Sequence, residues 1–379
     1  METRSPPPPP PSAHRPVLVV GASGQLGTRI VQQLSAARQP TRALVRASSR
    51  QQHLRLPRVD IVHADLAEPA SLDAAVQGAG TVIASASAMA PLAGSRFATV
   101  DDAGHAALIA ACVKHRVERF VLVSVPATPF EAKVPLFAHK RRTEQRLAGS
   151  GLPHAVLRFA PFMDTWFALA GLALATRGDA APLTARPWPF LQRFMGVVGG
   201  LAESRGLLIV PGGGDRRHAF IAVDDVARCC IAATRHPAAL NATLAIGGPE
   251  APSWHEVADQ MAVVLRRPVQ VVGTPAAVFA LQRLLMRPFS EAAANFMALN
   301  GFAAQPRPPE SPDAAASLGV PLTRVADFLR AQAASPCAST SSPTWPAPGA
   351  PSAWPAWSRR SRPWAPRPRA SSCTSSPSS

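Results

Sequence analysis

The chain has 379 residues, 47% of them hydrophobic, so it can bury one large core or two smaller ones. Its formal net charge at pH 7 is +16, and nearly all of its basic residues are arginines. Because these residues are spread along the chain and no run of them is interleaved with aromatic residues, we expect a solvated basic surface and no specific nucleic-acid partner.

The cysteines indicate a reducing compartment, and the apolar stretches are too short to indicate a transmembrane span. The five cysteines are odd in number and show no CxxC spacing, which argues against a disulfide framework and against a metal site. A proline run at 6–11 stands where a signal peptide would need apolar residues. The longest apolar stretch, residues 166–175, is too short to span a bilayer. We therefore expect a cytoplasmic protein with no transmembrane span.

Composition divides the chain into four parts. Residues 1–15 predict a disordered proline-rich arm. Residues 334–379 predict a disordered low-complexity tail, yet this segment holds four of the seven tryptophans. Disordered tails are usually poor in aromatic residues, so we interpret the tail as a translated out-of-frame extension. Between the ends we expect a dinucleotide-binding domain over 16–160 and a substrate region over 161–333 that is partly interleaved with the sheet of the first.

The stretch VLVVGASGQLG at 17–27 carries the first functional signal. Its apolar start predicts a buried strand, and the apolar residues that follow it recur at helical spacing. The glycines Gly21, Gly24 and Gly27 therefore lie on a strand-to-helix turn. Such a turn offers backbone N–H groups and the positive end of a helix dipole to a phosphate, with no side chains in the way.

The residues after the second strand bear on which dinucleotide is bound. Folds that bind NAD usually place an acid about 20 residues past the glycines, where it holds the ribose 2′-hydroxyl. No acid occurs between Glu2 and Asp60, and the second strand ends in Arg46, with Arg42 and Arg50 nearby. Cations there suit a 2′-phosphate, so we favour NADP over NAD. The alternative is that a chain so rich in arginine has arginines everywhere.

Strand and helix patterns alternate along the first part of the chain. Strands are predicted over 17–20, 43–45, 59–62, 81–88, 119–125 and 154–160, and helices over 71–76, 101–117 and 136–148. Most of these strands are apolar throughout, which is typical of a parallel sheet covered on both faces. We therefore predict an α/β fold with a doubly wound parallel sheet, of the Rossmann kind. The helix over 101–117 begins with two acids, as its dipole prefers.

The second region is less regular. Residues 161–176 and 188–202 are apolar, aromatic and rich in glycine, so they could line a substrate cleft, form a lid, dock on a membrane or complete the core. We favour packing in the core or in a lid. Residues 206–234 predict a strand, a glycine turn, a second strand and a helix. Ser253 and Glu256 have the spacing of a capping box at a helix start.

Six stretches together resemble a known family. They are GASGQLG, ADLAEPASLDAAVQGAGTVI, RVERFVLVSV, KRRTEQRLAGSGLPHAVLRFAPFMD, FIAVDDVAR and LAIGGPEAPSWHEVA. In these the chain, from about residue 17 to about residue 332, resembles the NmrA-like group of atypical short-chain dehydrogenase/reductases. The resemblance implies a Rossmann domain that binds NAD(P) and a small C-terminal substrate region. Some members of the group are reductases, whereas others bind the dinucleotide without turning it over and act as sensors, regulators or assembly factors.

The resemblance also implies a set of cofactor-binding residues. The phosphate loop would be formed by Gly21, Ser23, Gly24, Gln25, Leu26 and Gly27, and the 2′-phosphate contact by Arg46. By the same resemblance Asp65 and Leu66 contact the adenine, Ser85 and Ala86 lie beside the ribose, Lys140 lies near the nicotinamide ribose, and the segment from Phe159 to Phe162 passes the nicotinamide.

One departure from the family pattern bears on catalysis. An ordinary member pairs a tyrosine with a lysine four residues on, so that the phenol moves a proton and the ammonium lowers the pKa of that phenol. This chain has no tyrosine, and Leu136 stands four residues before Lys140. A reductase built on this chain must therefore take its proton from another side chain, from the substrate or from water.

Three further residues are candidates for polar roles. We expect His139 to be an exposed helix residue, because it adjoins Lys140 and successive helical side chains point about 100° apart. Ser124 stands where the superfamily usually has its catalytic serine, and it either binds a substrate carbonyl or caps a strand end. Asp164 could act as an acid only if burial raised its pKa. The catalytic candidates are thus Lys140, by holding ribose hydroxyls, and Ser124.

Two functions stay open. The glycine-rich apolar region favours an NADPH-dependent oxidoreductase that acts on a small, mostly apolar carbonyl or olefinic substrate. The missing tyrosine favours a non-catalytic NADP(H)-sensing regulator or assembly factor with a protein partner. We expect the reductase, because some relatives catalyse without that tyrosine.

Overall fold

The computed structural model of the protein describes residues 15–87, 97–306 and 313–335. All of these belong to one compact unit that runs to Ala338, and a second unit, Ser339–Ser379, lies outside the described residues. The predicted proline-rich arm, apart from Arg15, also lies outside them. The last helix, α13 (Val325–Ala334), runs one residue into the predicted tail, whose remainder from residue 336 is outside the described part.

Seven parallel strands form the central sheet, in the order β3-β2-β1-β4-β5-β6-β8. They are β1 (Val17–Val20), β2 (Thr41–Val45), β3 (Val59–His63), β4 (Thr81–Ala84), β5 (Arg119–Ser124), β6 (His154–Phe159) and β8 (Ala242–Ile246). The order confirms the predicted doubly wound parallel sheet. It reverses between β1 and β4, and ligands of such sheets bind in the crevice outside the strand ends at this reversal point.

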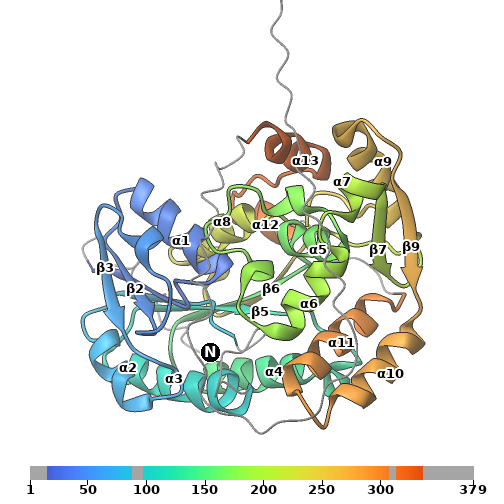
Figure 1. Cartoon of the computed structure of the whole chain (residues 1–379). Coiled ribbons are helices and arrows are strands. Elements are labelled where there is room, and N and C mark those ends of the chain that lie inside the picture. The colour runs from blue at the N-terminus through green and yellow to red at the C-terminus, as the bar shows by residue number, and fades with distance from the viewer. Residues whose placement is uncertain (1–14, 88–96, 307–312, 336–379) are drawn as a thin grey trace, which may run out of the picture. The chain divides into compact units, whose positions relative to one another are not determined.

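Alternating strand residues pack into two hydrophobic cores, one on each face of the sheet. In β1, Val17 and Val19 point to one core and Leu18 and Val20 to the other. Figure 1 shows the helices on the two sides of the sheet. The first core is covered by α1 (Gln25–Ala36) and α8 (Val223–Ala233), and the second by α2 (Pro69–Val76), α3 (His105–Lys114) and α4 (Pro135–Ala148).

The helix expected over 101–117 differs from the prediction at its start. A π-helical turn, Ala98–Gly104, precedes α3, and it contains both acids. Asp101 lies 3.5 Å from Lys140, and Asp102 pairs with Arg142 and Arg146. The acids therefore lie near the N-terminal end of their helical segment, as predicted, and they also bind side chains of α4.

The region after β6 contributes elements to both the sheet and a smaller layer. Its helices are α5 (Met163–Ala170), α6 (Pro189–Val198), α7 (Leu201–Arg205), α8, α9 (Trp254–Leu265), α10 (Ala276–Met286), α11 (Glu291–Ala303), α12 (Asp313–Ser317) and α13. The strands β7 (Leu207–Pro211) and β9 (Gln270–Thr274) form a separate two-stranded parallel sheet. The described residues contain no helix with the length and apolar character needed to cross a bilayer.

Two local predictions in this region have different outcomes. The capping box at α9 is confirmed, because the Ser253 side chain accepts from the Glu256 amide and Glu256 accepts from the Ser253 amide. The second strand expected before α8 is wrong. This segment makes only isolated bridges, between Phe162 and Ile221 and between Arg217 and Ser253, because it crosses from the sheet to α9 instead of pairing along a neighbour.

Candidate functional site

One cavity, about 350 Å³ in volume, lies at the carboxyl ends of the central strands. It brings together all of the residues that the sequence predicts for the site. These are Gly21, Ser23, Gly24, Gln25, Leu26, Gly27, Arg46, Asp65, Leu66, Ser85, Ala86, Ser124, Lys140, Phe159 and Phe162. They come from seven separate stretches of the chain. The parallel sheet places the strand ends side by side, and α4 adds Lys140.

The glycine turn after β1 has the geometry of a phosphate loop. Gly21 has a φ of +86°, and a Cβ on it would stand 2.8 Å from the Ala86 amide nitrogen. A Cβ on Gly27 would stand only 2.1 Å from the Gly21 carbonyl oxygen, so this glycine lets α1 pack directly on the turn. Gly24 precedes α1 in an extended conformation with no side-chain cap. The first amides of α1 therefore face a space that an anion can fill.

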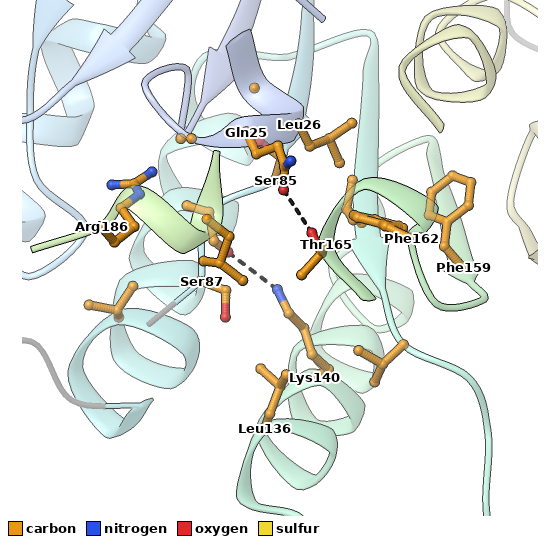
Figure 2. A pocket seen from close by; sticks show the side chains of 18 of the residues that line it. Gln25, Leu26, Ser85, Ser87, Leu136, Lys140, Phe159, Phe162, Thr165 and Arg186 are labelled. Atoms are coloured by element: carbon orange, nitrogen blue, oxygen red, sulfur yellow. Dashed lines mark hydrogen bonds between the residues drawn. The ribbon is translucent and has the colours of Figure 1, made fainter. Parts of the chain in front are cut away.

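Lys140 reaches the cavity from α4 and is almost fully buried (Figure 2). Its ammonium donates to the Ala86 carbonyl at 3.3 Å and lies 3.5 Å from the carboxylate of the fully buried Asp101. An ammonium has three protons, so this arrangement orients the group and leaves one proton for a ligand. Sequence reasoning missed Asp101. The two acids at positions 101 and 102 were a visible signal, but nothing local said that one faces Lys140.

A neutral histidine lies beside this ion pair. His105 is fully buried on α3 and its Nδ1 lies 2.9 Å from the Val100 carbonyl oxygen. Burial, and after it the nearby Lys140 ammonium, lowers the pKa of His105 to about 4. The imidazole is therefore uncharged at neutral pH, so the cationic groups of this corner of the site do not include it.

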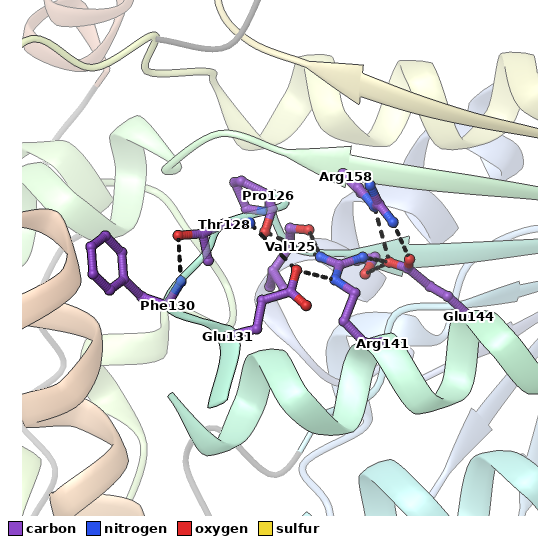
Figure 3. Close-up of polar contacts among 9 residues, drawn as sticks. Val125, Pro126, Thr128, Phe130, Glu131, Arg141, Glu144 and Arg158 are labelled. Atoms are coloured by element: carbon purple, nitrogen blue, oxygen red, sulfur yellow. Dashed lines mark hydrogen bonds and ion pairs between the residues drawn. The ribbon is translucent and has the colours of Figure 1, made fainter. Parts of the chain in front are cut away.

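Ser124 lines the cavity, but its hydroxyl hydrogen is already engaged. It donates to the buried carboxylate of Glu144, which also accepts from Arg158 at 2.6 Å and from Arg141 (Figure 3). Burial opposes the charge of Glu144, but hydrogen bonds from Arg158, Ser124 and Arg141 outweigh it and lower the pKa of this carboxyl. Ser124 can thus accept a hydrogen bond from a ligand, whereas donating one would break its bond to Glu144.

The other two polar candidates do not line the cavity. His139 was expected to be exposed, and this is wrong, because its side chain is 13% exposed, stacks on Phe97 and contacts Arg142 and Asp102. Burial lowers the pKa of His139. Asp164 is buried, and burial raises its pKa to about 6. Its carboxylate accepts from the Val223 amide at 3.0 Å, so it caps α8.

The opposite wall of the cavity is apolar and comes mainly from the second region. Residues 161–176 and 188–202 both contribute to it and also complete the core. The wall consists of Leu136, Phe159, Phe162, Trp166, Leu169, Trp188, Leu191, Phe296, Leu299 and Phe302. The last three come from α11, which sequence reasoning missed. Leu136 belongs to this wall, at the position where the family pattern has its phenol.

The fold and the site together define a class of protein. A parallel sheet in this order, with a glycine turn at its reversal point and a cavity above it, is a Rossmann dinucleotide-binding fold. Residues 21–180 match the family model described as NAD(P)H-binding. This part of the chain is therefore similar to NAD(P)H-binding proteins, which agrees with the resemblance to NmrA-like, atypical short-chain dehydrogenase/reductases.

Its relatives differ in their named activities. NAD(P)H azoreductase of Xenophilus azovorans is 26% identical over 258 residues, 68% of this chain and 76% of that protein. Photosystem II assembly factor Ycf39 of Cyanophora paradoxa is 32% identical over 148 residues, 39% of this chain. The match spans only 46% of the assembly factor's own length.

A solved structure shares the fold over most of the chain. An NADPH-dependent quinone oxidoreductase from Escherichia coli, solved with NADPH, superimposes with a TM-score of 0.60. The superposition covers 83% of this chain and 99% of that one, at 19% sequence identity. At this identity the likeness concerns the fold alone.

Proposed function

We propose that the protein is an NADPH-dependent reductase of a small, mostly apolar carbonyl or olefinic substrate. The observation that carries this proposal is the continuity of the cavity, which runs from the glycine turn past Lys140 to the apolar wall. A dinucleotide held at the glycine turn would direct its far end to the apolar wall, where an apolar ligand would bind. The azoreductase among the relatives supports this choice.

The charges around the cavity favour NADP(H) as the cofactor. Arg46 follows β2 and lines the cavity beside Ser49. No acid stands at the end of β2 to hold a free ribose 2′-hydroxyl, and a guanidinium there suits a 2′-phosphate. Asp65 and Leu66 would contact the adenine, and Ser85 and Ala86 the ribose.

Each side chain near the reacting end has a role in this proposal. When bound, the dinucleotide supplies a hydride. Lys140 would hold the nicotinamide ribose with its remaining proton, and the aromatic rings of Phe159 and Phe162 would exclude water from the nicotinamide. Ser124 would accept a hydrogen bond from a ligand. The proton that completes the reduction would come from water, because Leu136 replaces the phenol and the Ser124 hydroxyl hydrogen is donated to Glu144.

Without the phenol as a proton donor, some substrates are easier to reduce than others. Hydride addition to an ordinary ketone leaves an alkoxide, a strong base that needs a proton in the transition state. Addition to a quinone leaves a phenolate, a far weaker base that water can protonate afterwards. We therefore propose quinones and similarly activated acceptors as the substrate class, in preference to simple aliphatic ketones.

A second function has its own support. The chain has no tyrosine, and among its relatives is a photosystem II assembly factor. The alternative is therefore a protein that binds NADP(H) without turnover and presents one conformation to a protein partner.

The reducing cytoplasm stays our proposed location. The described cysteines Cys112, Cys229 and Cys230 are free and buried, as expected there.

Oxidation of NADPH by the full chain tests the proposal. We expect turnover with a quinone, and at least tenfold lower kcat/KM with an aliphatic ketone of similar size. Lys140→Met should weaken NADPH and NADH binding alike, by about tenfold or more, because the nicotinamide ribose is common to both. Lys133→Met, an exposed lysine outside the cavity, is the matched control. Tight NADPH binding with no turnover of any acceptor would favour the sensor instead.

A further inference from the structure

Arg186 reaches the predicted phosphate loop from the second region of the chain. It follows the short 3-10 turn Leu183–Ala185, and its Nη2 donates to the Ser23 carbonyl at 3.2 Å. The same nitrogen lies 3.5 Å from the position that a Cβ on Gly24 would take. The guanidinium of Arg186 therefore lies against the glycine turn (Figure 2). Arg186 and Arg46 both line the cavity.

In the described part of the chain, no acid forms an ion pair with Arg186. Among the described residues, no carboxylate oxygen lies within 4.0 Å of its guanidinium. Burial, and after it the nearby Arg46, lowers the pKa of Arg186. Two half-buried guanidinium groups that face the same cavity repel each other, and an anion with two charges placed between them would remove this repulsion.

The segment that carries Arg186 is fastened to the same loop at a second place. The Gln25 amide donates to Asp179 at 2.7 Å, and its oxygen accepts from Thr165 at 2.8 Å. Two residues beyond Arg186 stands Trp188, which forms part of the apolar wall and packs edge-on against Phe296. A ligand held by Arg186 would therefore also fix the wall at Trp188.

We propose that Arg186 binds the 2′-phosphate of NADP(H) together with Arg46, and that this contact fixes the substrate wall. The inference rests on the proposed NADP(H) site and adds a specificity-determining residue from outside the Rossmann segment. The 2′-phosphate is preferred over the pyrophosphate because Arg46, the neighbour of Arg186, stands at the end of β2, on the ribose side of the glycine turn. The pyrophosphate has the amides of α1.

Calorimetric titration of the full chain with NADPH and NADH tests the proposal. In Arg186→Gln we expect the Kd for NADPH to rise about tenfold to a hundredfold, the range for losing a charge-assisted hydrogen bond. The Kd for NADH should change by less than about twofold, because NADH lacks the 2′-phosphate. Arg193→Gln, an exposed arginine on α6 outside the cavity, is the matched control and should change neither.

The possible results separate cleanly. Equal weakening of NADPH and NADH would overturn the assignment to the 2′-phosphate, and so would unchanged NADPH binding. If Arg186→Gln does not fold, Arg186→Lys decides, since it keeps the charge but loses the two-pronged contact. It should weaken NADPH binding and 2′,5′-ADP binding but not the binding of NADH or 5′-AMP. If the original chain binds neither dinucleotide, the proposed function itself fails. If the original chain binds NADPH and the Arg186 variants bind it equally well, only the role of Arg186 is ruled out.

Discussion

Asp164 shows how a buried carboxyl can have a structural role beside a functional site. The helix α8 begins at Val223, and the methyl group of the preceding Ala222 cannot accept a hydrogen bond from the free amides. Asp164, from α5, supplies the acceptor instead, at 3.0 Å from the Val223 amide. Its burial favours the neutral acid and raises the pKa to about 6 from 3.8.

This raised pKa predicts a pH dependence of stability. A carboxyl whose pKa is higher in the folded state stabilises the fold fully below its unfolded pKa, and this contribution is lost as pH rises through the folded pKa. Relative to Asp164→Asn, the unfolding free energy of the unaltered chain should fall by roughly 2–3 kcal/mol between about pH 4 and pH 7. Urea unfolding across this range measures it. A difference that stays constant with pH would contradict the prediction, and Asp327→Asn, at an exposed site, is the control.

At the scale of elements, Glu144 joins three of them behind the cavity. It lies on α4 and binds Ser124 at the end of β5 and Arg158 on β6. Its third partner, Arg141, also donates to Glu131 and to the carbonyls of Val125 and Pro126, which line the cavity (Figure 3). The carboxylate therefore fixes both the strand ends and the loop after β5.

Removing this carboxylate should be costly. Glu144→Ala leaves two arginines and a serine without their shared acceptor, and we expect a loss of about 3–5 kcal/mol in the unfolding free energy. Asp327→Ala breaks an exposed ion pair with Arg330 on α13 and should cost less than about 1 kcal/mol. Urea unfolding of both variants decides. Equal small losses would show that the buried network adds little to stability.

The order of elements in the first half of the molecule could be predicted from the sequence. The strands from β1 to β6 are short apolar runs, and the helices between them end at clear signals, so periodicity identifies both. The strand β8 was not predicted, because its residues alternate between half-buried and exposed over only five positions at the sheet edge. α11 escaped because its residues 292–298 are buried on every side, which removes the helical periodicity.

Within the site, the glycine turn was predicted from a local pattern, because its spacing marks a strand-to-helix turn. The dinucleotide contacts outside that turn were named from the family resemblance. The pairing of Asp101 with Lys140 and the approach of Arg186 to Ser23 join residues far apart in sequence. Such contacts depend on how whole elements pack, and no local pattern encodes them.

For the molecule as a whole, the proposed function requires that one dinucleotide binds in the cavity that the sheet and the second region form together. Titration of the full chain with NADPH in a calorimeter tests this most directly. We predict one site per chain and a Kd at least tenfold lower for NADPH than for NADH. Failure to bind either nucleotide would contradict the proposed function, because the cavity between the glycine turn, Arg46 and Lys140 would then not be a dinucleotide site.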